Sequence, residues 1–108
     1  MYTKGPGSRE KPLERKFNRW VTSIGGESVK GPSYTNKGIP DRIVVLPNGG
    51  GTIWVEFKGG TSYQLTPTQI IWRNRLMDSN PNTYFLVDTI DDLNKLIEHC
   101  KSLIDYKG

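Results

Sequence analysis

Two carboxylates and a lysine flank a predicted turn near the middle of the chain. Asp41 precedes a β-branched run at residues 42–46, and Glu56 and Lys58 lie at the end of a second run at residues 52–58. Hard cations such as Mg²⁺ prefer oxygen ligands and usually take one or two protein carboxylates together with water and phosphate. A lysine beside such a cation can hold a phosphate, orient an attacking water and stabilise charge in the transition state. These three residues therefore indicate metal-dependent chemistry on a phosphate ester.

The two runs are expected to pair as a β-hairpin, because the Asn48-Gly49 dipeptide between them tolerates the positive φ angles of a tight turn. A two-residue turn there pairs residues whose numbers sum to 97, so Asp41 lies opposite Glu56. Facing carboxylates repel each other unless a cation lies between them. Alternation along the strand puts Glu56 and Lys58 on one face and Phe57 on the other, towards the core. The alternative interpretation is that Glu56 and Lys58 are ordinary solvent-facing residues and that this register is wrong.

Three blocks of sequence in a fixed order resemble a known family. They are Gly38-Ile39-Pro40-Asp41, Glu56-Phe57-Lys58 and Gln69-Ile70-Ile71-Trp72-Arg73, and their order and spacing are similar to those of the virus-type replication-repair nuclease (VRR-NUC) domain. That family is a branch of the PD-(D/E)xK nuclease superfamily, and the resemblance runs from about Glu14 to about Val87. It implies a divalent-metal-dependent DNA endonuclease with Mg²⁺ or Mn²⁺ as cofactor and no organic cofactor. The family includes enzymes that resolve four-way junctions and others that cut flaps, and this compact form resembles those of phages.

The resemblance also implies roles for individual residues around the metal. Asp41 and Glu56 would be metal ligands, with the backbone carbonyl of Phe57 as a further ligand. Lys58 would orient the nucleophile and stabilise the transition state. Glu14 would be a further metal-site carboxylate supplied by the first helix.

Two of the residues that the resemblance selects also have structural explanations. On the sequence pattern alone Glu14 is a residue at the edge of a helical stripe that can pair with a neighbouring polar side chain, and Glu10 is a competing candidate. Gln69 lies three residues after Thr66, so it can form the return half of a capping box. The family places a Gln at this position near the metal, and the two roles of Gln69 are compatible.

The distribution of charge favours a nucleic-acid partner. The net charge is +4, but residues 1–48 carry nine Lys or Arg against four Asp or Glu, whereas residues 49–108 carry six against seven. A basic half suits a phosphate backbone, because binding to it is mostly electrostatic. We expect the DNA contacts to come from Lys30, Lys37, Arg42 and Arg73. Lys30 matches a lysine of the family but is equally explained as an ordinary exposed residue.

The composition bounds the class of protein. We expect one domain at residues 13–108 and a flexible basic arm at residues 1–12. The longest apolar runs are far shorter than the roughly 18 residues of a membrane span, and the first residues lack the apolar core of a signal peptide, so we expect a cytoplasmic protein, in the host cytoplasm if it is phage-encoded. A single cysteine, Cys100, and a single histidine, His99, exclude an intramolecular disulfide and a Cys/His zinc site.

Periodicity and turn residues predict seven elements in the order α-β-β-β-α-β-α. The fold class is therefore α/β (α+β), with a central mixed sheet and helices on both faces. The elements are a helix at 13–24 stopped by Gly25-Gly26, a strand within 27–35 that Gly31-Pro32 interrupts, the hairpin strands, a helix at about 67–78 capped by Thr66, a strand at 83–87 and a last helix capped by Thr89.

Both later helices carry more apolar residues than a narrow stripe needs. The helix at 67–78 is expected to pack against the sheet, and the last helix is expected to cover the core with any excess left for a subunit contact. We therefore expect a homo-oligomer, with a dimer favoured. Cys100 is assigned to the core and His99 to the surface, not to catalysis. The alternatives to a nuclease are a DNA-binding module or an assembly subunit that uses the same fold without chemistry.

Overall fold

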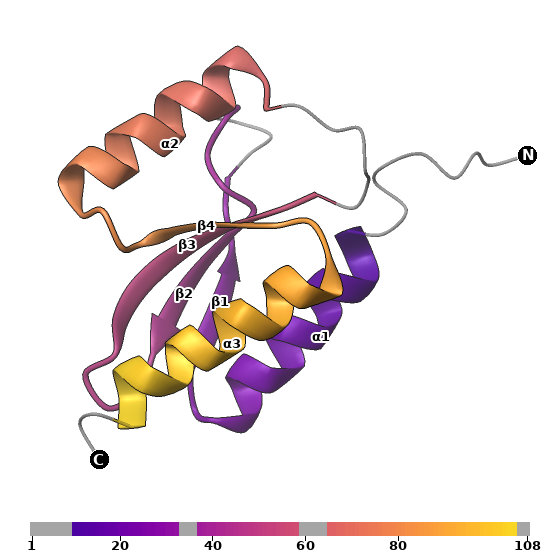
Figure 1. Ribbon diagram of the computed structural model, residues 1–108, viewed down its shortest axis with the longest axis vertical. Helices are drawn as coiled ribbons and strands as arrows, with labels where there is room; N and C mark the ends of the chain where they lie inside the picture. Colours follow the sequence, from indigo (N-terminus) through magenta and orange to yellow (C-terminus); the bar gives the residue numbers. More distant parts are fainter. Residues whose placement is uncertain (1–9, 33–36, 59–64, 106–108) are drawn as a thin grey trace, which may run out of the picture.

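The seven predicted elements are all present and in the predicted order (Figure 1). The computed structural model describes residues 10–32, 37–58 and 65–105, so most of the predicted basic arm lies outside the described residues. The elements are α1 (Glu10–Ser23), β1 (Glu27–Lys30), β2 (Arg42–Leu46), β3 (Gly51–Phe57), α2 (Pro67–Ser79), β4 (Tyr84–Val87) and α3 (Ile90–Asp105). The α/β class with a mixed sheet is confirmed.

The sheet has the strand order β1-β2-β3-β4. The first two pairings are antiparallel and the pairing of β3 with β4 is parallel. Parallel neighbours need a crossover connection, and α2 supplies it on one face of the sheet, while α1 and α3 lie side by side across the other (Figure 1). Helices therefore cover both faces, as predicted.

The hairpin has the register that the Asn-Gly turn predicts. Ile43 pairs with Trp54 and Leu46 with Gly51, so paired numbers sum to 97. The two turn residues, Asn48-Gly49, have φ angles of 55° and 76°, and the N–H of Gly50 donates to the carbonyl of Pro47 at 3.0 Å. Two successive positive φ angles are typical of the hairpin turn that matches the twist of the strands.

The first helix is longer than predicted at its start and shorter at its end. It begins at Glu10, and Pro12 is tolerated there because first-turn N–H groups have no partner within a helix. It ends at Ser23, and Gly25 follows with a φ of 86°. The N–H groups of Gly25 and Gly26 donate to carbonyls of the last turn at 3.1 and 2.9 Å. The predicted glycine stop is confirmed, because these two bonds form the left-handed cap that glycine favours.

The strand β1 ends at Lys30, five residues before the predicted limit of 35. Gly31 turns the chain against Pro40, since a Cβ on Gly31 would lie 2.2 Å from the Pro40 carbonyl oxygen. The Gly31 N–H donates to the carbonyl of Asp41 at 2.7 Å. Pro32 then lacks an N–H with which to continue the ladder.

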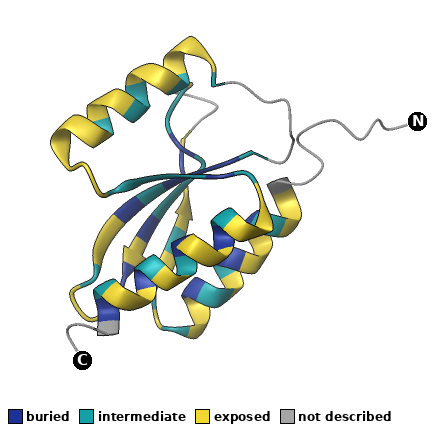
Figure 2. Cartoon of the chain, in the orientation of Figure 1, coloured by how far each residue is buried: buried dark blue, intermediate teal, exposed yellow. Residues whose placement is uncertain are grey.

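The hydrophobic core lies between the sheet and the pair α1 and α3 (Figure 2). Alternate residues of β2 and β3 point into it, and Phe17 of α1 contacts the ring of Phe57 at a centroid distance of 6.0 Å. Cys100 is fully buried there, as predicted. The buried apolar residues are Phe17, Val21, Val44, Leu46, Ile53, Val55, Phe57, Val87, Leu93, Leu96, Cys100 and Ile104.

The helix α2 lies on the sheet, where it contacts β4, as expected, but it buries none of its apolar residues there. None of its residues is buried, and Ile70, Ile71 and Met77 are exposed (Figure 2). The apolar residues of α2 also include Trp72 and Leu76, and the whole set is spread around the helix, so no single face could bury all of them. On β1 and β2, Val29 and Val45 point away from the core and are also about half exposed. Most of the large exposed apolar residues in the described ranges are therefore on the α2 side of the sheet, and α3 contributes Ile90 at its first position.

His99 is less exposed than the predicted surface residue. It is partly buried on α3, with its ring against that of Phe85 on β4 at a centroid distance of 5.1 Å. An aromatic neighbour on the edge strand explains the burial, which α3 periodicity alone does not indicate. None of the helices in the described ranges combines the length and apolar composition needed to cross a membrane.

Candidate active site

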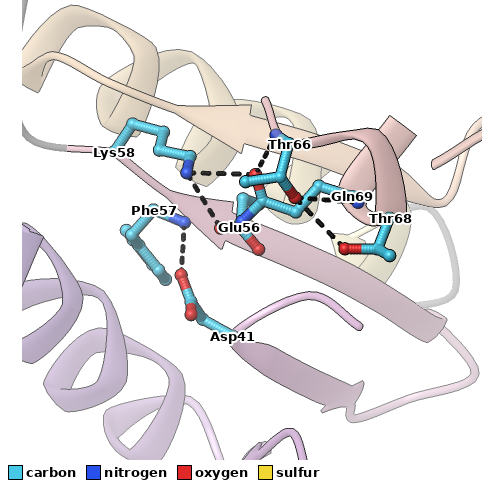
Figure 3. A network of polar contacts seen from close by, with 7 residues as sticks. All are labelled: Asp41, Glu56, Phe57, Lys58, Thr66, Thr68 and Gln69. Carbon is cyan, nitrogen blue, oxygen red and sulfur yellow. Dashed lines mark hydrogen bonds and ion pairs between the residues drawn. The ribbon is translucent and has the colours of Figure 1, made fainter. Parts of the chain in front are cut away.

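Asp41 is held at the open end of the β2–β3 ladder. Along β3, the N–H groups of Trp54 and Lys58 donate towards β4, to Thr83 and Val87 at 2.7 and 2.8 Å. Because backbone direction alternates along a strand, the N–H groups of Val55 and Phe57 point to the other side, towards β2. At Phe57 the ladder of β2 has ended, and Oδ2 of Asp41 accepts the Phe57 N–H at 2.8 Å (Figure 3). The carboxylate thus replaces a missing strand partner.

The direction of the Phe57 N–H also gives the direction of the Phe57 carbonyl, which is the predicted metal ligand. In a strand, the N–H and C=O of one residue point to the same neighbouring strand. The Phe57 carbonyl therefore projects from the edge of β3 on which Asp41 lies. Its role as a ligand stays a prediction, and its direction is suitable for one.

Glu56 and Lys58 share the opposite face of β3 from Phe57 and meet Gln69 of α2. Glu56 is only 4% exposed, and its Oε2 lies 3.7 Å from Nζ of Lys58. The Gln69 side chain joins both, because Oε1 accepts from Lys58 Nζ at 3.2 Å and Nε2 donates to Glu56 Oε2 at 3.1 Å (Figure 3). The predicted convergence of these three residues is present.

The helix cap determines which way the Gln69 amide points. The Thr66 N–H can only donate, and it donates to Gln69 Oε1 at 2.8 Å, which leaves Nε2 for Glu56. In return the Gln69 N–H donates to Thr66 Oγ1 at 3.2 Å. The predicted capping box is confirmed, and it holds Gln69 in contact with both Glu56 and Lys58.

Gly38 brings the Gly38–Asp41 segment against the first turn of α2. Its φ is +98°, and a Cβ there would lie 2.4 Å from the backbone oxygen of Thr68. A glycine is needed for both reasons, the backbone conformation and the close approach. This contact places Asp41 and Gln69, which are 28 positions apart in the sequence, on one rigid unit.

Glu14 is buried next to this unit but has a different partner from the predicted one. It is 8% exposed, and its Oε2 accepts from Arg42 Nε at 2.6 Å. The sequence suggested a neighbouring polar side chain, and no local signal pointed to a residue 28 positions away. Among the described residues no group of three His, Cys, Asp or Glu side chains is arranged to hold a metal ion, so Glu14 does not join Asp41 and Glu56 in a three-carboxylate cluster.

The environment of Asp41 disfavours its negative charge. Burial raises its pKa, and the negative charge of Glu14 raises it further. The hydrogen bond from Phe57 and the positive charges of Lys58 and Lys30 act in the opposite direction without cancelling the effect. A bound cation would offset the unfavourable charge. Two carboxylates and a backbone carbonyl are the hard oxygen donors that Mg²⁺ and Mn²⁺ take, so the donor set fits such an ion.

The four predicted DNA-contacting residues have different surroundings. Lys30 is exposed, pairs with Arg42 across β1 and β2, and lies near enough to act on Asp41. Lys37 is exposed. Arg42 is occupied by Glu14 and, at 3.5 Å, by the carbonyl of Ser28. Arg73 is partly buried and donates to Asn74 at 3.2 and 3.3 Å. Lys30 and Lys37 are therefore the more accessible of the four.

A mixed four-stranded sheet with Asp41 at the start of β2, Glu56 and Lys58 at the end of β3 and Gln69 at the start of α2 defines a class of protein. The chain has the fold of a VRR-NUC-type nuclease domain. A solved structure described as a VRR_NUC domain superposes with a TM-score of 0.73 and 26% sequence identity, covering 84% of this chain and 96% of that one.

A phage protein is also similar in sequence. The chain is 43% identical over 61 residues to "Putative nuclease p44" of Acyrthosiphon pisum secondary endosymbiont phage 1. The match covers 53% of this chain and 64% of that protein, so it spans less than two thirds of the relative's length. No family model matches the sequence.

Proposed function

We propose that the protein is a divalent-metal-dependent DNA endonuclease of the PD-(D/E)xK type. The observation that carries the proposal is the position of the Asp41 carboxylate, on the Phe57 N–H at 2.8 Å, beside the linked pair Glu56 and Lys58. The fold of a VRR-NUC domain and the name of the phage relative support the same reaction class.

Asp41 and Glu56 would hold Mg²⁺ or Mn²⁺ between β2 and β3, with the Phe57 carbonyl as a third donor. A bound ion of this kind supplies Lewis-acid polarisation of the phosphate and lowers the pKa of an attacking water. Glu14 would act on the site only through its negative charge near Asp41, because Arg42 occupies its carboxylate.

Lys58 and Gln69 would position the reacting groups. Nζ of Lys58 lies at hydrogen-bond distance from Gln69 Oε1, so its remaining N–H donors can be directed at a phosphate oxygen or an attacking water. Gln69 holds both Lys58 and Glu56, and the helix cap holds Gln69. This arrangement reduces the reorganisation that the transition state would otherwise require.

We propose a symmetric dimer as the working form, in the cytoplasm of the host. The exposed apolar residues of α2, together with Val29 and Val45 on the same side of the sheet, supply surface for a second copy. Two active sites related by a two-fold axis would suit a four-way junction, and one site at a time would suit a flap. Sedimentation of wild type and Val45→Lys tests this, because a monomeric wild type would remove the proposal.

The decisive experiment measures cleavage of linear, nicked, flap and four-way DNA with Mg²⁺, Mn²⁺ or chelator. Cleavage should need the metal and should be lost in Lys58→Ala, whose circular dichroism spectrum should match that of wild type. Equal cleavage by wild type and Lys58→Ala with Mg²⁺ present would remove the mechanism.

An assembly or DNA-binding module without chemistry is the alternative that the unburied apolar residues of α2 favour. This alternative predicts no cleavage with any metal, and DNA binding or assembly that does not depend on metal. DNA binding that survives while no metal supports cleavage would identify the binding module, and failure to bind nucleic acid at any salt concentration would identify the assembly subunit.

A further inference from the structure

Positively charged residues form a row on the solvent face of α1. Lys11, Arg15 and Arg19 follow one another at intervals of four, which places them on one side of the helix, and Lys16 flanks them. All four are exposed. At about 1.5 Å per residue, the row from Lys11 to Arg19 is about 12 Å long.

These charges have no acidic partners among the side chains that the structure describes. The ion pairs found there are Glu14 with Arg42, Glu56 with Lys58 and Glu98 with Lys101, and none involves the row on α1. The exposed face of α3 is different, because Asp91, Lys95, Glu98 and Lys101 alternate in sign along it. Mixed signs are typical of a helix face that only meets water, so the uniform sign of these four residues needs another explanation.

The stability of α1 does not supply that explanation. Like charges at intervals of four repel each other, and a positive charge in the first turn, such as Lys11, opposes the helix dipole. The row is therefore unfavourable for the free domain and would become favourable beside a partner of dense negative charge.

The row is held rigidly in relation to the candidate active site. Phe17 and Val21 fix the opposite face of α1 in the core, and Asn18 accepts a hydrogen bond from Ser28 of β1 at 2.7 Å. Glu14, between Lys11 and Arg15, joins α1 to Arg42, which follows Asp41 directly. One end of the row thus lies at the Asp41 end of the sheet, and the other end lies beside a shallow hollow lined by Arg19, Asn18, Thr22 and Ser23.

We propose that this face of α1, formed by Lys11, Arg15, Lys16 and Arg19, binds the phosphate backbone of a DNA duplex arm next to the cleavage position. The inference rests on the proposed nuclease function and adds the element that holds the substrate. Contacts of this kind position the duplex and carry no base specificity. They act equally on substrate and transition state, so they affect KM and not kcat.

The test compares Lys11→Gln/Arg15→Gln/Arg19→Gln with a control of equal charge change, Arg75→Gln/Lys95→Gln/Lys101→Gln, on α2 and α3. Fluorescence anisotropy with a labelled four-way DNA, in chelator so that no cleavage occurs, gives the dissociation constant over a series of salt concentrations. Each lost phosphate contact should lower the slope of log K against log salt by about 0.9, so the α1 variant should lose about 2 to 3. With Mg²⁺, its KM should rise at least about tenfold at unchanged kcat, and the control should match wild type.

The outcomes separate this inference from the proposed function. Wild type and α1 variant with equal slopes, while wild type still cleaves DNA, would overturn the role of α1 and leave the nuclease intact. An equal loss in both triple variants would also overturn it, because net charge alone would then explain the effect. A wild type that neither binds nor cleaves any of the DNA substrates would overturn both.

Discussion

The carboxylate of Asp41 accepts a hydrogen bond from the N–H of Phe57 at 2.8 Å, just beyond Arg42 and Val55, the last residue pair of β2 and β3. A side chain therefore continues a ladder that the backbone no longer can. The bond fixes Asp41 against the end of β3, at the residue that follows Glu56. It also ties the geometry of the candidate site to the register of the hairpin, which the Asn48-Gly49 turn determines.

Replacing Asp41 by Asn should abolish cleavage and stabilise the metal-free protein at neutral pH. Burial and Glu14 raise the folded-state pKa of Asp41 above the ordinary value of 3.8. The associated stability is complete below pH 3.8 and is lost as the pH rises through the folded-state pKa, since the native state then holds a charge that the unfolded state carries more easily. An Asn can still accept the Phe57 N–H and has no such charge.

Thermal melting between about pH 4 and pH 8 measures this effect. The gain in melting temperature of Asp41→Asn over wild type should grow with pH in chelator and shrink when Mg²⁺ is added to both. Asp41→Ala is the control that also loses the hydrogen bond. A wild type more stable than Asp41→Asn at neutral pH without metal would contradict the raised pKa.

Removing Gln69 should reduce activity beyond its effect on the helix cap. Gln69→Ala loses its half of the capping box and also the bonds to Lys58 and Glu56. Thr66→Ala loses the other half of the box and the contact with Thr68 Oγ1, but the backbone N–H that holds Gln69 Oε1 remains. Each should cost about 1 kcal/mol of stability. We expect a large fall in kcat for Gln69→Ala and a small one for Thr66→Ala, and equal falls would mean that Gln69 serves only the cap.

Gly38→Ala should destabilise the protein more than Gly25→Ala and should also impair cleavage. Both glycines have positive φ angles, +98° and +86°, which cost an alanine about 1–2 kcal/mol. Only at Gly38 would the new Cβ meet backbone, at 2.4 Å from the Thr68 oxygen, and forced overpacking of this kind adds about 1 kcal/mol or more. Denaturant titration of both variants gives the difference. Equal stability losses in the two variants would show that the Gly38–Asp41 segment is not in close contact with α2.

The thiol of Cys100 should be unreactive in the folded protein. Burial raises its pKa from 9.0 to about 12, and only the thiolate is nucleophilic. A disulfide reagent at about pH 8 should therefore label Cys100 only after denaturant is added. The raised pKa also affects stability at alkaline pH. The unfolded chain loses the thiol proton more easily than the folded protein, so the free energy of unfolding falls as the pH rises from 9.0 towards 12, by about 1.4 kcal/mol per pH unit. In Cys100→Ala the free energy of unfolding should fall less steeply over this range. Labelling of the folded wild type as fast as that of an exposed thiol would contradict the burial of Cys100.

Local rules explain the parts of the fold that the sequence predicts correctly. The hairpin register follows from the φ angles that Asn48-Gly49 permits, and the start of α2 follows from Thr66, Pro67 and Gln69 within one turn. The order of elements follows from periodicity. The candidate site was predictable to the same extent, because Asp41, Glu56 and Lys58 belong to one hairpin and Gln69 to the next element.

Other features depended on contacts between residues far apart in the chain. The pairing of Glu14 with Arg42, the burial of His99 beside Phe85 and the exposure of α2 are of this kind. The sequence by itself determined the backbone conformations, the register and the identity of the chemical groups, because these follow from local sterics and short-range periodicity. Only the tertiary structure decided which carboxylate met which cation and which apolar face was left uncovered, because those depend on how helices dock across the whole sheet.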